Sequence, residues 1–149
     1  MRETLFRGKR VDNDEWAVSG DIFLGGKRKY IYIPNPDTDM SAKAYLCREV
    51  IPETVGQFTG LKAYWDEFEE EADIWEHDIL EVTYENKQVI AKVEFEAGMF
   101  ILCSNEFPDS YIPLFDVVVI EDDYHIEAKK IGNIHDNPEL LKEGVNNDL

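Results

Sequence analysis

The sequence has few basic residues, few cysteines and no long apolar run. Its 149 residues include 15 Lys and Arg against 32 Asp and Glu, for a formal net charge of −17. This excess excludes a protein that coats nucleic acid or anionic membranes through its net field, because phosphate groups are repelled. No apolar run approaches the roughly 18 residues of a membrane-spanning helix. The first ten residues also lack the apolar block of a signal peptide. We therefore expect a soluble, intracellular protein.

The chain contains only two cysteines. Cys47 and Cys103 are far apart in the sequence, and neither belongs to a C-x-x-C pair. This usage is typical of a reduced protein in which cysteines serve as small buried apolar groups.

Motifs of common catalytic and cofactor sites are also missing. The chain contains no G-x-G-x-x-G, P-loop, H-E-x-x-H or G-x-S-x-G sequence. His77, His125 and His135 are scattered, without a pair at metal-ligand spacing. The acidic string at residues 35–39 lacks the glycine and the glutamate of a calcium-binding loop. We predict no catalytic, cofactor-binding or metal-ligating residues, and a hydrolytic or metal-dependent enzyme is the least favoured alternative.

Apolar residues make up 44% of the chain, enough for a packed core in one domain or in two small subdomains. The charge is uneven along the sequence. Residues 1–48 hold nine basic and seven acidic side chains, a net +2, whereas residues 49–149 hold six and 25, a net −19. A solubilising surface is the favoured interpretation of this asymmetry, and an interaction surface or pairing between copies is the alternative.

Strand patterns outnumber helix patterns in the first part of the chain. Alternating tyrosine and isoleucine at 30–33 predicts a β-hairpin over about residues 15–33, and another strand is expected at 44–51. Gly56 and Gly60 indicate turns. Apolar spacing over 64–75 favours a short acidic helix, with an irregular acidic loop as the alternative.

A second group of strands follows. We expect them at 79–84, 89–95, 99–103, 115–120 and 131–134, with a terminal helix beginning at Asn137-Pro138. The predicted fold is therefore mainly β. It has an N-terminal β subdomain (1–62), an acidic segment (63–76) and a C-terminal SH3-like small β-barrel with a short helix (77–149).

Three strings of the sequence resemble the YopX family, small proteins encoded mainly by phages and prophages. They are LFRGKR at 5–10 followed by DEW at 14–16, ETVGQFTGLK at 53–62, and IGNIHDNPELL at 131–141. The resemblance implies a mainly β fold with an SH3-like C-terminal part. It also implies a phage or prophage origin and expression in the cytoplasm of a bacterial host, and it assigns no activity.

The chain departs from the family pattern at two places. His77 stands where the family usually has glycine, and the acidic stretch Ala63–Asp73 replaces a family turn. Anything that the family turn does is therefore not carried over to this chain.

The leading functional hypothesis is a non-enzymatic β module without cofactors that self-associates and binds a host or phage protein. Its candidate interaction residues are Arg7, Lys9, Arg10, Lys27, Arg28, Lys29, Asp66, Glu67, Glu69, Glu70, Glu71, Asp73 and Glu76. The alternative is a nucleic-acid-directed protein: either a DNA mimic that uses its acidic surface, or a single-strand binder that uses the basic residues with Tyr30 and Tyr32. Membrane binding is not expected.

Overall fold

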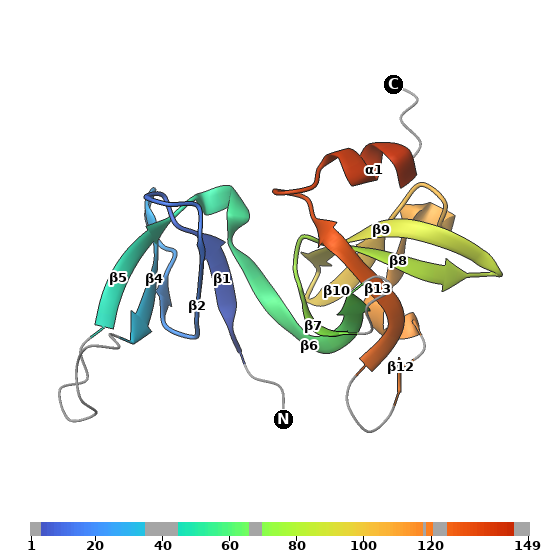
Figure 1. Ribbon diagram of the computed structural model, residues 1–149, viewed down its shortest axis with the longest axis horizontal. Helices are drawn as coiled ribbons and strands as arrows, with labels where there is room; N and C mark the ends of the chain where they lie inside the picture. The colour runs from blue at the N-terminus through green and yellow to red at the C-terminus, as the bar shows by residue number, and fades with distance from the viewer. Residues whose placement is uncertain (1–3, 35–44, 66–69, 118, 121–124, 145–149) are drawn as a thin grey trace. The chain divides into compact units, whose positions relative to one another are not determined.

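The computed structural model describes residues 4–34, 45–65, 70–117, 119–120 and 125–144 (Figure 1). The chain divides into two compact units, Met1–Phe58 and Thr59–Leu149. Their boundary falls inside strand β6 (Gly56–Trp65), and the boundary expected after residue 62 lies further along the same strand. Each unit is described by itself below.

The first unit is built from short antiparallel strands. They are β1 (Phe6–Lys9), β2 (Trp16–Ser19), β3 (Ile22–Phe23), β4 (Lys29–Pro34) and β5 (Tyr45–Val50). Strand β1 pairs with β2, and β3, β4 and β5 form a three-stranded sheet. The hairpin predicted for residues 15–33 is therefore shorter than expected. Ile22 pairs with Ile31, whereas Trp16 pairs with Lys9 of β1.

A small core of Ala17, Ile31 and Val50 holds the first unit together. Gly8 permits close packing here, because a Cβ at this position would lie 3.0 Å from the Val50 Cβ. Thr54 links β1 to the turn before β6. Its hydroxyl accepts a hydrogen bond from the Lys9 amide at 2.8 Å and donates one to the Ile51 carbonyl at 2.6 Å.

The second unit contains the rest of β6 and one large sheet. Its other elements are β7 (Glu70–Trp75), β8 (Asp78–Tyr84), β9 (Lys87–Glu96), β10 (Met99–Cys103), β11 (Tyr111–Pro113), β12 (Val119–Ile120), β13 (His125–Asn133) and helix α1 (Glu139–Gly144). The strand order is β11-β10-β9-β8-β13-β6, with β7 paired to β6 and β12 to β13. Strand β13 runs antiparallel to β8 and parallel to β6. Helix α1 lies beside β9 (Figure 1).

The meander of β8, β9 and β10 confirms the strands expected at 79–84, 89–95 and 99–103. Its turns, Glu85-Asn86 and Ala97-Gly98, have positive φ at both residues. This conformation matches the twist of two paired strands, which is why two residues suffice. The mainly β class and the short C-terminal helix are confirmed.

One face of this sheet supplies the larger core. Its buried members come from six strands and the loops that follow them: Leu61, Ala63, Ile74, Leu80, Val82, Val89, Ala91, Val93, Phe100, Leu102, Phe107, Leu114, Val117, Ile126 and Ala128. Because strands alternate their side chains, the opposite face carries the polar Glu81, Thr83 and Lys129, together with the buried Ile79 and Ile101.

The acidic segment is neither the helix nor the loop that the sequence favoured, since its described part forms strands. Strand β7 buries Ala72 and Ile74 and exposes Glu71 and Asp73. A helix would bring like charges together at four-residue spacing, whereas a strand sends them to solvent and the apolar side chains to the core. Residues 66–69 lie outside the described part.

Two other expectations are corrected. The run at 115–120 is not one buried strand: a 3-10 turn occupies Leu114–Asp116, and Phe115 is 53% exposed. Gly56 and Gly60 lie within β6 rather than in turns. Gly60 has φ 85°, which kinks the strand without ending it.

A buried ion pair connects three strands of the second unit. The Lys130 ammonium on β13 lies 3.1 Å from the Asp78 carboxylate on β8, and these side chains are 7% and 0% exposed. The same ammonium donates to the main-chain carbonyl of Asp73 on β7 at 2.9 Å. The Asp78 carboxylate also accepts the Trp75 amide at 2.7 Å, which closes the β7–β8 turn.

Substitution Lys130→Met is expected to lower the free energy of unfolding by about 3–5 kcal/mol, because it leaves the Asp78 carboxylate buried without its cation. Lys62→Met is the matched control, since it breaks the exposed Lys62–Glu71 pair of 3.4 Å and is expected to cost at most about 1 kcal/mol. Urea unfolding of the full chain measures both values. Equal small losses would contradict a structural role for the buried pair.

Candidate functional site

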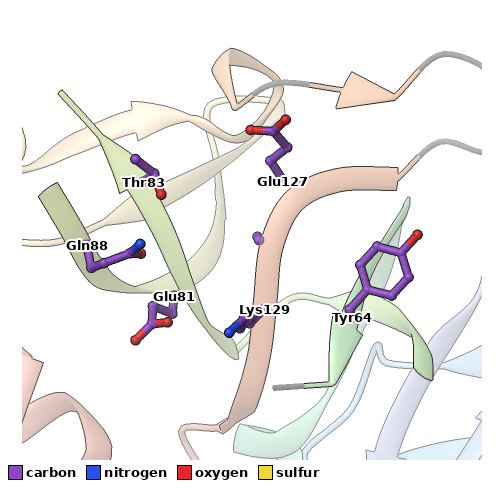
Figure 2. A pocket seen from close by; sticks show the side chains of 7 residues that line it. Tyr64, Glu81, Thr83, Gln88, Glu127 and Lys129 are labelled. Carbon is purple, nitrogen blue, oxygen red and sulfur yellow. The ribbon is translucent and has the colours of Figure 1, made fainter. Parts of the chain in front are cut away.

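The outer polar face of the second unit's sheet contains a groove of about 550 Å³. It is lined by Tyr64, Glu81, Thr83, Gln88, Glu127, Ala128 and Lys129 (Figure 2). These residues come from β6, β8, β9 and β13, so the groove crosses four strands of one sheet.

Strand register places the lining side chains in two rows. In the first row Lys129 on β13 lies between Tyr64 on β6 and Glu81 on β8. In the second row Thr83 on β8 pairs with Gln88 on β9. Glu127 on β13 comes directly before Ala128, which pairs with Val82 on β8. Side chains in register on one face of a sheet stand close enough to contact one ligand together.

An irregularity in strand pairing lies beside the groove. Strand β6 advances from Lys62 to Tyr64 while its partner β13 advances from His125 to Lys129. The extra residues of β13 interrupt the regular pairing of the two strands there. Ala128 lies in this irregular stretch, and its side chain belongs to the core on the other face rather than to the two polar rows.

The second unit carries the whole net charge of the protein. Residues 59–149 hold 23 acidic and six basic side chains, whereas residues 1–58 hold nine of each. The groove belongs to this acidic unit and presents Glu81 and Glu127 together with Lys129. Among the described residues, no ion pair joins Lys129 to either carboxylate. The groove is therefore suited to polar ligands that carry positive charge.

A second cluster surrounds the turn between β7 and β8. The Nε2 atom of His77 lies 3.5 Å from the Glu76 carboxylate and 3.9 Å from that of Glu94. Its Nδ1 atom lies 3.2 Å from the Nε2 atom of His135, with the two rings at 83°. Burial is the main cause that raises the pKa of Glu94 above its ordinary value. Imidazole and carboxylate together are ligands for transition metals.

Sequence alone offers little sign of this cluster. His77 and His135 are 58 positions apart, so their contact depends on the tertiary fold. The unusual residue at 77 was a better signal. Its φ of 79° suits the glycine of the family pattern, and a residue with a Cβ costs roughly 1–2 kcal/mol in this conformation.

The basic candidate residues are mostly occupied within the first unit. Arg7 is only 6% exposed, and its guanidinium lies 4.2 Å from the centre of the Trp16 ring. It is therefore buried, whereas a candidate interaction residue was expected at the surface. The Lys9 ammonium lies 5.6 Å from the same ring. Arg10 binds Asp12 through two hydrogen bonds, of 2.9 and 2.7 Å.

The tip of the β3–β4 hairpin holds the other basic candidates. The Lys29 ammonium donates to the carbonyls of Leu24 and Gly26 at 2.5 and 2.7 Å, which closes the turn. Lys27 and Arg28 are exposed in that turn. The basic residues thus do not form the continuous free patch that single-strand binding requires.

The acidic candidates are spread over β7 and the turn after it. Glu70 is exposed, and Glu71 pairs with Lys62. Asp73 is exposed, and Glu76 is part of the histidine cluster. The other three lie outside the described residues: Asp66, Glu67 and Glu69.

A family model described as YopX protein matches residues 5–142, nearly the whole chain. The chain belongs to the YopX family. A search of curated proteins found no match. Within the part of this YopX protein that the structure describes, no helix is long and apolar enough to cross a membrane.

Two of the three YopX strings have structural roles that the hydrogen bonds explain. In the second string the Thr59 hydroxyl donates to the Ile74 carbonyl at 2.7 Å and accepts the Leu61 amide at 3.1 Å. In the third string the side-chain oxygen of Asn133 accepts the amides of the next turn, those of His135 and Asp136, both at 2.9 Å. The second string thereby connects β6 to β7, and the third stabilises the turn after β13.

The third string also requires its glycine. A Cβ at Gly132 would lie 2.4 Å from the side-chain oxygen of Asn137, which itself accepts the Asn133 amide at 3.3 Å. The turn after β13 is therefore tightly packed, and it places His135 beside His77.

The two thiols are expected to differ in reactivity. Cys47 is exposed, contrary to the expectation that both cysteines are buried, whereas Cys103 is partly buried. Burial, followed by the nearby Glu94 carboxylate, raises the pKa of Cys103.

Iodoacetamide near pH 8 is therefore expected to modify Cys47 severalfold faster than Cys103, as followed by mass spectrometry. Cys47→Ser should leave only the slow phase, and equal rates at both thiols would contradict this difference.

Proposed function

We propose that this YopX protein is a non-enzymatic interaction module whose acidic unit binds a basic segment of a partner protein. The observation that carries the proposal is the groove across β6, β8, β9 and β13 within a unit that holds 23 acidic and six basic residues. Complementary charge raises the association rate and selects partners by sign.

The side chains of the groove suit an extended peptide. The Glu81 and Glu127 carboxylates can accept hydrogen bonds from lysine or arginine side chains. Lys129 and Gln88 can donate to main-chain carbonyls of the peptide, and the Tyr64 ring offers an apolar surface. A volume of about 550 Å³ accommodates a few side chains rather than a folded domain.

The resemblance to phage and prophage proteins adds a setting to the proposal. The partner is then a host or phage protein, and binding takes place in the bacterial cytoplasm. A basic DNA-binding protein has the required chemistry, so DNA mimicry is a special case of the same proposal. Direct single-strand binding is disfavoured, because Arg7 stacks on Trp16 and Arg10 pairs with Asp12.

A Lys- and Arg-rich peptide of about ten residues is expected to bind the groove. Titration of the ¹⁵N-labelled full chain should shift the amide resonances of Thr83, Gln88 and Lys129. The double variant Glu81→Gln, Glu127→Gln should bind the peptide about fivefold to thirtyfold more weakly, because two partly exposed charge contacts are lost.

The matched control makes the same charge change in the first unit, with Glu49→Gln and Glu53→Gln. It should leave the affinity within about twofold, because neither carboxylate lines the groove. A Glu-rich peptide of equal length should not bind. Equal weakening by both double variants, or shifts spread over the first unit, would contradict the proposed groove.

Self-association is the second part of the proposal. Edge strands with exposed apolar side chains support it: Val18 on β2 is 42% exposed, Phe23 on β3 is 51% exposed and Tyr111 on β11 is 46% exposed. Light scattering should give a molar mass above 17.3 kDa that rises with protein concentration. A monomeric mass at every concentration and ionic strength would contradict self-association while leaving the peptide proposal standing.

A further inference from the structure

The backbone at the β7–β8 turn fixes the position of His77. The His77 amide donates to the Val93 carbonyl on β9 at 2.7 Å, and the His77 carbonyl accepts the Ile134 amide at 2.9 Å. These bonds hold a non-glycine residue at a φ of 79°. Unfavourable backbone conformations persist where the surrounding structure over-determines them, and they concentrate at binding and catalytic sites.

The tautomer of the histidine pair decides whether the His77 Nε2 presents a proton or a lone pair to the carboxylates. A hydrogen bond between the two facing nitrogens requires one of them to carry the proton and the other to accept it. When the His77 Nδ1 donates to the His135 Nε2, the lone pair of the His77 Nε2 points toward Glu76 and Glu94. A lone pair facing two carboxylates is electrostatically unfavourable without a cation between them.

The distances fit an ion at this position. Ligands about 2.0–2.1 Å from a tetrahedral Zn²⁺ are roughly 3.3 Å apart. The His77 Nε2 lies 3.5 and 3.9 Å from oxygens of Glu76 and Glu94, and one ligand atom from each of the three residues lies within 4.8 Å of the others. His77 is 14% exposed and Glu76 is 21% exposed, so an ion can enter from solvent.

We propose that Glu76, His77 and Glu94 bind a divalent transition-metal ion of the Zn²⁺ type, with His135 positioning the imidazole of His77. A metal-bound histidine that donates its other ring N–H to an acceptor is the usual arrangement around such ions. One imidazole and two carboxylates favour Zn²⁺ or Co²⁺ over Mg²⁺ and Ca²⁺, which prefer oxygen ligands alone. The site does not depend on the proposed peptide groove.

The neighbouring charges are compatible with this ion. The Lys92 ammonium lies 3.7 Å from Oε2 of Glu94, whereas Oε1 is the atom nearer His77. Lys92 thereby partly offsets the charge of one carboxylate without occupying the space beside the imidazole.

The test uses the untagged full chain with ZnCl₂ and CoCl₂ as probes. Isothermal titration is expected to show one saturable Zn²⁺ site, and Co²⁺ should give the visible absorption of a site with low coordination number. Both signals should disappear in His77→Gly, a variant whose residue suits the backbone at this position, and in Glu94→Gln. The melting temperature of His77→Gly without metal should be equal to or higher than that of the parent chain, which separates loss of the site from loss of the fold.

Two further variants identify the roles. His135→Ala should lower the affinity for Zn²⁺ about tenfold to a hundredfold while the Co²⁺ absorption persists, as expected for a positioning residue. Glu53→Gln, an exposed carboxylate of the first unit, is the matched control for Glu94→Gln and should leave the affinity unchanged. Zn²⁺ binding that survives in His77→Gly and Glu94→Gln would overturn the proposal, and so would equal affinity for Mg²⁺ or the absence of saturable binding.

Discussion

The buried pair of Asp78 and Lys130 is the interaction on which the second unit depends. Removing two charges from water is costly, and the cost is offset here because each group has further partners. The carboxylate also accepts the Trp75 amide, and the ammonium also donates to the Asp73 carbonyl. One pair of side chains thereby fixes β7, β8 and β13 relative to one another.

Both candidate sites follow from this constraint. The β7–β8 turn that Asp78 closes carries Glu76 and His77, and β13 leads from Lys130 into the turn that carries His135. On the outer face, Lys129 is the neighbour of Lys130, so the register that buries one lysine sends the other into the groove. The groove and the histidine cluster thus share strands whose positions the same buried pair determines.

Local patterns predicted the parts of the fold that depend on neighbours in sequence. Alternation at Val89, Ala91 and Val93, between the turns expected at Glu85-Asn86-Lys87 and Ala97-Gly98, was enough to identify the meander. The spacing of Trp65, Phe68, Ala72 and Trp75 favoured a helix, but the described part is strand because Ile74 packs into the core beside Leu61. Periodicity alone does not reveal that a buried partner exists.

The candidate sites were harder to predict, for physical reasons. Arg7 is an ordinary basic residue in sequence, and only the pairing of β1 with β2 shows that its charge lies over Trp16. The groove combines side chains of β6, β8, β9 and β13, whose register, with its shift between β13 and β6, cannot be read from composition or spacing. The cluster depends on a contact between His77 and His135, and its one local signal was a histidine at a position suited to glycine.

Native-state hydrogen exchange at the β7–β8 turn tests the central claim most directly. The amides of Trp75, His77 and Ile134 donate to Asp78, Val93 and His77, respectively. If the buried pair fixes this turn, these three amides should exchange only when the whole second unit unfolds, with the protection of the core amides of Leu80 and Val82. Exchange of the Trp75 and His77 amides orders of magnitude faster than that of the core would show that the turn opens on its own, and would contradict the account.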